Sequence, residues 1–296
     1  MKNSRVDKLT AEKRIYEFPC LAQTLGKNWI AKEYKKPLVS RSLIAGWISL
    51  EDNHLGRWLV DLESAMTFLK ERVPLNVWQV IASKLRLHSD RANFKGTIAE
   101  LSLCVFLVSH GISFDLERVL DISNPKDIDI RADFGPDKKS VYIEVQWLSP
   151  SETSEHGATI ASYYGEAYPM DYDEEKYRIK AKVYDKTSKF TQNDITLVAL
   201  DCTTAPELGG SHRFSVIAEA LTEAFTGQDW NGSATGYTDS KIDTAIREYA
   251  DGVIWFEQEQ GKALIPIKRG IYLNPRSPFK DNPAIVEFAE IWRQNE

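Results

Sequence analysis

Two short runs near the middle of the chain alternate polar and apolar residues, a pattern typical of a β-strand with one buried face. The first run is Asp127–Arg131 and the second is Val141–Gln146. The residues between them include Phe134, Gly135 and Pro136, which favour a turn. The chain therefore predicts an antiparallel hairpin whose second strand buries its apolar side chains.

The register of this hairpin sets polar side chains face to face. A turn centred between residues 136 and 137 places Asp129 opposite Glu144, and the same register sets Asp127 opposite Gln146. Opposed side chains in an antiparallel pair have Cβ atoms about 5 Å apart, and like charges there are destabilising. A divalent cation is the usual partner of clustered carboxylates, although Arg131 is a second group able to neutralise either acid. We therefore expect a catalytic metal site at this hairpin.

Helical spacing of apolar residues dominates the first part of the chain, and helices and strands interleave after residue 90. Helices are predicted at residues 54–70, 77–85, 91–110, 174–190, 214–225 and 284–293, and further strands at residues 112–120, 195–200, 252–256 and 263–273. This order indicates an α/β protein. We expect a helical N-terminal region at residues 1–89 and a second domain at residues 90–296.

Two segments show neither pattern. The lysines within residues 1–38 indicate a partly ordered arm or a solvated face. Residues 149–173 form a long polar and aromatic loop, a length typical of functional lids. His156 lies in this loop, and we interpret it as incidental because the acidic residues at the loop's end would repel phosphate.

The composition narrows the class of protein. A hydrophobic content of 43% and a charged content of 27% are ordinary for a globular protein, and the net charge of −6 gives no support for broad nucleic-acid binding, although it leaves room for a local basic groove. The three cysteines lack metal-type spacing, and Cys104 and Cys202 lie in apolar runs, as expected for buried thiols in a reducing compartment. With no apolar leader and no membrane-length run, we expect a soluble cytoplasmic protein.

The order of elements over roughly residues 91 to 202 resembles the PD-(D/E)XK nuclease superfamily. The core of that superfamily is a helix carrying a Glu, a strand, a hairpin carrying an Asp and then E-x-K, and a further helix and strand. The matching residues are Glu100, Asp129 (or Asp127) and the tripeptide Glu144–Gln146. The resemblance implies a restriction-endonuclease-like mixed sheet flanked by helices, and metal-dependent hydrolysis of phosphodiester bonds in nucleic acid, with DNA favoured over RNA.

The resemblance also implies roles for these residues. Asp129, Glu144 and the Val145 carbonyl would hold Mg²⁺, for which Mn²⁺ would substitute, with Asp127 as the second choice of aspartate. Glu100 would be an additional ligand or would support the ligands. Gln146 stands where the family has a lysine that orients and activates water, so it can position a water but brings no cation. The lysines able to take over that role are Lys182, Lys186, Lys95 and Lys126.

The predicted helix at residues 174–190 carries a basic stripe. Arg178, Lys182, Lys186 and Lys189 fall on one helical face, which could follow a phosphate backbone or could simply be solvated. Enzymes of this fold often dimerise, so a homodimer is among the expectations.

Two other interpretations stay open. The first is a catalytically inactive relative with the same fold that binds nucleic acid or protein, and it is motivated by Gln146 and the acidic net charge. The second is an interaction protein whose acidic hairpin forms surface ion pairs worth about 0 to 1 kcal/mol.

Overall fold

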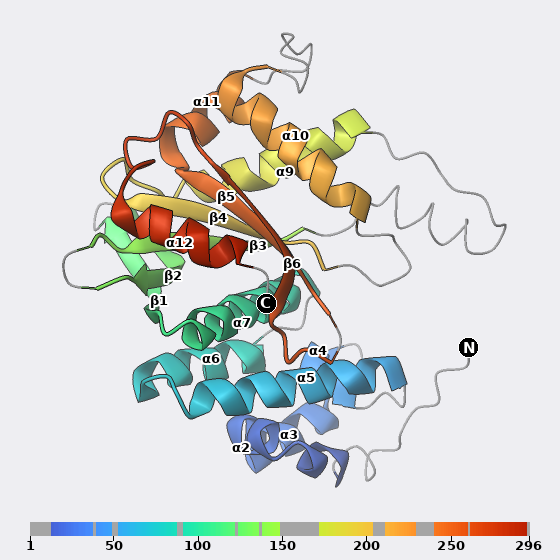
Figure 1. Ribbon diagram of the computed structural model, residues 1–296. Coiled ribbons are helices and arrows are strands. Elements are labelled where there is room, and N and C mark those ends of the chain that lie inside the picture. Colours follow the sequence, from blue (N-terminus) through green and yellow to red (C-terminus); the bar gives the residue numbers. More distant parts are fainter. Residues whose placement is uncertain are drawn as a thin grey trace, which may run out of the picture. The chain divides into compact units, whose positions relative to one another are not determined.

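The computed structural model in Figure 1 describes residues 13–37, 40–48, 53–87, 91–121, 124–135, 138–148, 172–203, 211–228, 240–259 and 261–294. The chain divides into two compact units. The first unit comprises Met1–Ile112 with Gln258–Ile267, and the second comprises Ser113–Glu257 with Lys268–Glu296. The boundary expected between residues 89 and 90 falls inside the first unit, so the helix that carries Glu100 belongs to the helical part of the chain.

The first unit is helical, as its periodicity predicts. Its elements are η1 (Ile15–Glu17), α2 (Pro19–Leu25), α3 (Lys27–Lys35), α4 (Leu43–Ile48), α5 (Asn53–Lys70), α6 (Leu75–Leu87) and α7 (Arg91–Ser109). The apolar residues of α5 that recur at helical spacing, such as Leu62, Met66 and Leu69, are fully buried. Gly111 has a φ of 70°, the left-handed conformation that commonly ends a helix, and α7 ends just before it.

Of the two alternatives for the N-terminal lysines, a partly ordered arm is wrong for residues 13–37, which fold as short packed helices, whereas a solvated face fits Lys27, Lys32 and Lys35, which are exposed. Leu21 and Leu25 are one helical turn apart and both are buried. The Glu63 side chain of α5 accepts hydrogen bonds from the Cys20 and Leu21 N–H groups (2.7 and 2.8 Å), so a distant carboxylate caps the start of α2. The sequence pattern did not reveal this packing, because the many lysines surround only a narrow stripe of apolar side chains.

The prediction of a strand over residues 263–273 is wrong at its start, because β6 (Pro266–Leu273) begins three residues later. Ala263 and Leu264 have φ values of 50° and 62°, so they belong to a turn of left-handed residues. The Asp61 carboxylate of α5 accepts hydrogen bonds from the N–H groups of Gly261 (2.8 Å) and Ala263 (2.9 Å). These contacts hold the unusual turn in place.

The second unit contributes the sheet. Its strands are β1 (Ser113–Asp121), β2 (Asn124–Asp133), β3 (Val141–Trp147), β4 (Ile195–Asp201), β5 (Gly252–Gln258) and β6, in spatial order β1-β2-β3-β4-β5-β6. The β1, β2 and β3 strands pair antiparallel, whereas β3, β4 and β5 pair parallel. The structure is therefore an α/β protein with a six-stranded mixed sheet flanked by helices, as the element order predicts.

Helices cover both faces of this sheet (Figure 1). On one face lie α9 (Tyr172–Thr187), α10 (Ser211–Thr226) and α11 (Ser240–Tyr249), whose apolar side chains share one core with those of β4 and β5. On the other face lies α12 (Pro283–Arg293), where the Trp292 ring meets Phe256 of β5 edge to face. With both faces covered, β4 is buried along its whole length, which explains its continuous apolar run. The sequence prediction lacked α11, although its Ile242 and Ile246 are buried.

Two findings concern the features that the composition raised, namely the cysteines and membrane-spanning segments. Cys104 and Cys202 are buried free thiols as predicted, and so is Cys20. Among the helices that the structure describes, none has both the length and the apolar character needed to cross a membrane.

Replacing Asp61 with Ala should destabilise the first unit. The change leaves two backbone N–H groups without their carboxylate acceptor, and hydrogen bonds to charged groups are each worth about 1.5 to 3 kcal/mol. We expect the free energy of unfolding to fall by about 2 to 4 kcal/mol, measured by urea unfolding with circular dichroism. Glu71→Ala is the control, because Glu71 is exposed and its ion pair with Arg72 lies at the surface. Equal losses in the two variants would contradict the role of Asp61.

Candidate active site

The hairpin of β2 and β3 brings Asp129 and Glu144 together. Its backbone register pairs Ala132 with Val141 and Ile130 with Ile143, so the next position along sets Asp129 beside Glu144 as predicted. At this position, carboxylate side chains accept the hydrogen bonds between the two strands. The Val145 N–H donates to Asp129 Oδ2 (2.8 Å), and the Asp129 N–H donates to Glu144 Oε1 (3.1 Å). Each carboxylate thus accepts a hydrogen bond from the backbone of the opposite strand.

Two lysines at the end of α9 supply the counter-charge to these acids. Lys186 Nζ lies 3.1 Å from Glu144 Oε2 and 3.7 Å from Asp129 Oδ2. Lys189 Nζ lies 2.8 Å from Glu144 Oε2 and 2.9 Å from its Oε1, and also donates to the Asp127 carbonyl (2.8 Å). Arg131, the expected alternative, instead contacts Asp133 (3.0 Å) and Ser140 (3.0 Å). In the structure the counter-charge comes from ammonium groups of the chain itself, and the expected divalent cation stays a prediction.

The position of α9 explains why these lysines reach the hairpin. Ile179, Val183 and Phe190 are buried in the core shared with β4 and β5, which docks one side of the helix on the sheet. Lys186 follows Val183 by three residues, so it emerges beside this apolar stripe. Lys189 lies just past the last helical turn and is held against the same carboxylate.

Glu144 is the most confined member of the cluster, since its side chain is 0% exposed. Burial raises the pKa of its carboxyl above the ordinary value, and the neighbouring charge of Asp129 raises it further, whereas Lys186 and Lys189 act in the opposite direction. Asp129 is 16% exposed, so the open side of the pair is the aspartate side. A raised pKa on a buried carboxyl beside a lysine is an arrangement often seen at catalytic sites.

Two other predicted hairpin residues take different positions. The amide nitrogen of Gln146 donates to the Trp147 carbonyl (2.9 Å), a neighbour along its own strand, rather than to the carboxylates. Asp127 is exposed, and Lys189 contacts it through the backbone carbonyl. Val145 uses its N–H on Asp129, while the role of its carbonyl as a ligand stays a prediction.

Glu100 belongs to the first unit, where it lies in α7. Lys84 of α6 approaches its carboxylate to 2.6 Å, and both side chains are 15% exposed. This pairing explains how a helix with so many apolar residues carries one acid. The predicted role of Glu100 toward a metal stays a prediction.

The basic stripe of α9 is largely engaged within the chain. Arg178 forms two hydrogen bonds with Glu175, at 2.9 and 2.6 Å, and Lys186 contacts the site acids. Lys182, one turn before Lys186, is half-buried. Lys95, an alternative source of the missing cation, lies over the Trp58 ring in the first unit. Binding of a phosphate backbone by Arg178, Lys182 and Lys186 stays a prediction.

The donor set of the pair suits a hard divalent ion. Mg²⁺ commonly takes one or two carboxylates and completes its coordination with waters and substrate phosphates. Asp129 and Glu144 supply two such carboxylates, and no cluster of three or more His, Cys, Asp and Glu residues with metal-binding geometry occurs in the part of the chain that the structure describes. Because ammonium groups contact both oxygens of Glu144, an ion bound there would replace one of those contacts.

Several expectations lie outside the described residues. These include His156 and the rest of residues 149–171, together with the side chain of Lys126. The one residue that sequence reasoning undervalued is Lys189, which it placed on the basic stripe but not in the site. Its spacing of three from Lys186 was the available signal.

Comparisons with protein-family models, with curated proteins and with solved structures found no match to this chain. The case for a function therefore comes from the residues and their geometry.

Replacing Glu144 with Gln tests its raised pKa. A carboxyl whose pKa is higher in the folded state contributes its stability below the unfolded pKa, and loses this contribution as the pH rises through the folded pKa. The free energy of unfolding of E144Q minus that of the wild type should therefore increase as the pH rises above the ordinary pKa of a glutamate. Urea unfolding at constant ionic strength measures this difference.

Glu287→Gln is the matched control, because Glu287 pairs with Lys138 at the surface and its side chain is 40% exposed. We expect no comparable trend for this variant. If the E144Q difference shrank as the pH rose, the inferred direction of the pKa would be wrong.

Proposed function

We propose that this protein is a metal-dependent nuclease with a restriction-endonuclease-like core, acting on phosphodiester bonds in nucleic acid and on DNA in preference to RNA. The observation that carries the proposal is the contact of Lys186 with both Asp129 and Glu144. The sequence lacks the motif lysine, since Gln146 stands in its place, and Lys186 brings an ammonium group to the same two carboxylates from the following helix.

The acids have complementary roles in this proposal. Asp129, on the more open side, presents its carboxylate toward the substrate, while Glu144 is fixed from behind by two lysines and a backbone N–H. A divalent ion held by these carboxylates would neutralise charge on the scissile phosphate and lower the pKa of a bound water. Fixed carboxylates of this kind provide preorganised electrostatics, because they need no rearrangement when charge develops.

The lysines also have distinct roles. Lys186 faces both acids, so its ammonium group is able to stabilise negative charge on a phosphate oxygen beside them. Lys189 also contacts the Asp127 carbonyl, so it acts as a positioning residue that ties the carboxylate of β3 to the start of β2. Lys182 and Arg178 extend the positive charge along α9 toward a phosphate backbone.

One observation favours a second candidate function, a catalytically inactive module with the same fold that binds nucleic acid or protein. The two acids and the two lysines balance in charge, and the amide of Gln146 is directed at a backbone carbonyl. A balanced buried cluster of this kind also serves as a purely structural element.

Cleavage assays separate the two functions. The purified protein is incubated with linear, circular and single-stranded DNA and with RNA, in EDTA, Mg²⁺ or Mn²⁺. We expect cleavage that depends on the divalent ion, with a rate reduced at least about a hundredfold in Asp129→Asn, Glu144→Gln and Lys186→Met, since each removes a charge from the reacting region. Binding to the same DNA, measured by fluorescence anisotropy in Ca²⁺, should survive in Glu144→Gln, which leaves the predicted phosphate-binding residues Arg178, Lys182 and Lys186 unchanged.

Lys280→Met and Glu290→Gln are the controls, because both residues are exposed in the second unit and neither belongs to the carboxylate pair or to the basic stripe of α9. They should cleave at the wild-type rate. Intact binding with no cleavage by the wild type in any metal would establish the inactive module instead. Full activity of Lys186→Met would contradict the nuclease proposal, because that proposal depends on the contact of Lys186 with both acids.

A further inference from the structure

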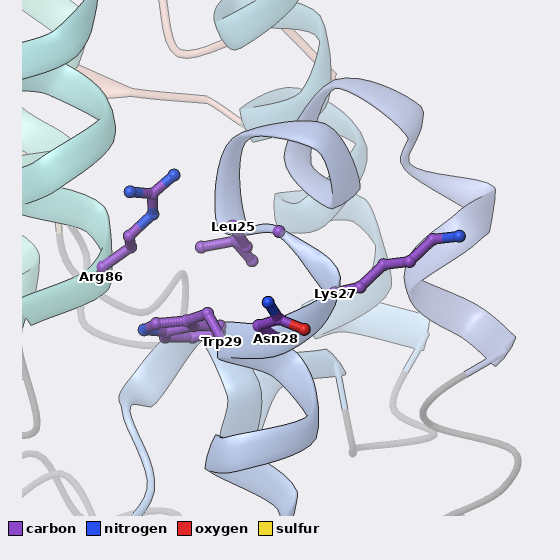
Figure 2. Close-up of a pocket in the computed structure, with 6 residues that line it drawn as sticks. Leu25, Lys27, Asn28, Trp29 and Arg86 are labelled. Carbon is purple, nitrogen blue, oxygen red and sulfur yellow. The ribbon is translucent and has the colours of Figure 1, made fainter.

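A second feature with ligand-binding chemistry lies in the first unit. A pocket of about 500 Å³ is lined by Leu25, Gly26, Lys27, Asn28, Trp29 and Arg86. Pockets of a few hundred Å³ suit small-molecule ligands. Five of the lining residues are consecutive and span the junction of α2 and α3, and Arg86 reaches in from α6 (Figure 2).

The lining combines positive charge with an aromatic face. Two of the six residues, Lys27 and Arg86, are cationic, and none of the six is acidic, although the whole chain carries a net charge of −6. In Figure 2 the indole of Trp29 and the side chain of Arg86 lie on the same side of the pocket, while Lys27 extends to the other side. An indole offers a stacking surface to a planar ring, and a guanidinium binds phosphate oxygens in pairs.

The guanidinium of Arg86 is held in position by the chain itself. It donates a hydrogen bond to the Thr24 carbonyl at the end of α2. A guanidinium has five N–H donors, so this contact fixes the group and leaves further donors for a ligand. Restricting a long side chain in advance lowers the entropy lost on binding.

Gly26 adds to the openness of the pocket. It has a φ of 79°, a left-handed conformation that glycine adopts without strain, and a Cβ placed there would meet no atom within 4 Å. The α3 helix starts directly after it, and Gly26 supplies no side-chain cap to that helix. The backbone N–H groups of the first turn are therefore additional donors for an anion that the Arg86 side chain already attracts.

We infer that this pocket binds a phosphorylated nucleoside, with the base stacked on Trp29 and the phosphate held by Arg86, while Lys27 adds positive charge on the other side. The ligand is either a free nucleotide or a terminal nucleotide of a nucleic-acid strand, since both present the same base and phosphate. This inference does not depend on the nuclease proposal, because the pocket and the carboxylate cluster belong to different units.

Calorimetry with AMP tests the inference on the full-length protein. We expect one binding site, with adenosine and inorganic phosphate each binding at least about tenfold more weakly, because each lacks one of the two recognised groups. Trp29→Leu and Arg86→Gln should each weaken AMP binding about tenfold. Arg86 is exposed, so its variant tests the pocket even if replacing the half-buried Trp29 disturbs folding.

Matched controls come from the same unit. Trp78→Leu removes a half-buried indole of α6 outside the pocket, and Arg72→Gln removes an exposed guanidinium that lies over Phe68. Both should bind AMP within about twofold of the wild type, a change of less than 0.5 kcal/mol by the usual conversion. Because the pocket and the carboxylate cluster belong to different units, a failure of the nuclease proposal would leave this result intact.

A 5′-phosphorylated oligonucleotide distinguishes the two sources of the ligand. Tighter binding than AMP, lost in Trp29→Leu and Arg86→Gln, would assign the pocket to a strand end, and weaker binding would assign it to free nucleotides. The inference is overturned if neither AMP nor the oligonucleotide binds at about millimolar concentration. It is also overturned if the control variants lose as much affinity as the pocket variants.

Discussion

The structure of the second unit depends on a fully buried carboxylate and the charges that accompany it. Glu144 lies on β3 between the paired β2 and the parallel β4, with no exposure to solvent. A buried carboxylate without partners would cost far more than a folded domain can spare. Lys186 and Lys189 supply those partners, and they require the end of α9 to lie against the hairpin. The same ion contacts therefore connect the antiparallel half of the sheet to the helix that covers its parallel half.

In the nuclease proposal, this arrangement supplies from another element the ammonium group that Gln146 does not bring. A lysine that follows the glutamate by two positions would approach from the same strand, whereas Lys186 approaches from the next helix. The position of an ammonium group relative to two carboxylates is what matters for charge stabilisation, and the chain offers more than one backbone location for it. Two lysines already neutralise the two acids. A divalent ion would therefore compete with the lysines for Glu144, because it must replace an ammonium contact there.

Much of the second unit could be predicted from the chain alone. Period-2 alternation located β2 and β3, and turn chemistry at Gly135 implied a register that sets Asp129 beside Glu144, which the backbone pairing confirms. The errors occurred where long-range contacts decide local structure. The Glu63 side chain caps α2 within a segment rich in lysine, and Asp61 holds Ala263 and Leu264 in a left-handed turn where their apolar character predicted a strand. Local secondary-structure propensity carries no information about a carboxylate that is contributed by another part of the chain.

The sequence by itself determined which acids face each other, because side-chain alternation and the turn are local properties of one hairpin. It also determined that one side of α9 is basic, since helical spacing fixes which residues share a face. Only the tertiary structure decided which cations meet those acids. The docking of α9 through Ile179 and Val183 turns Lys186 and Lys189 onto Glu144, while Arg131 turns away to Asp133. That choice rests on packing between elements more than 40 residues apart, which periodicity along the chain does not encode.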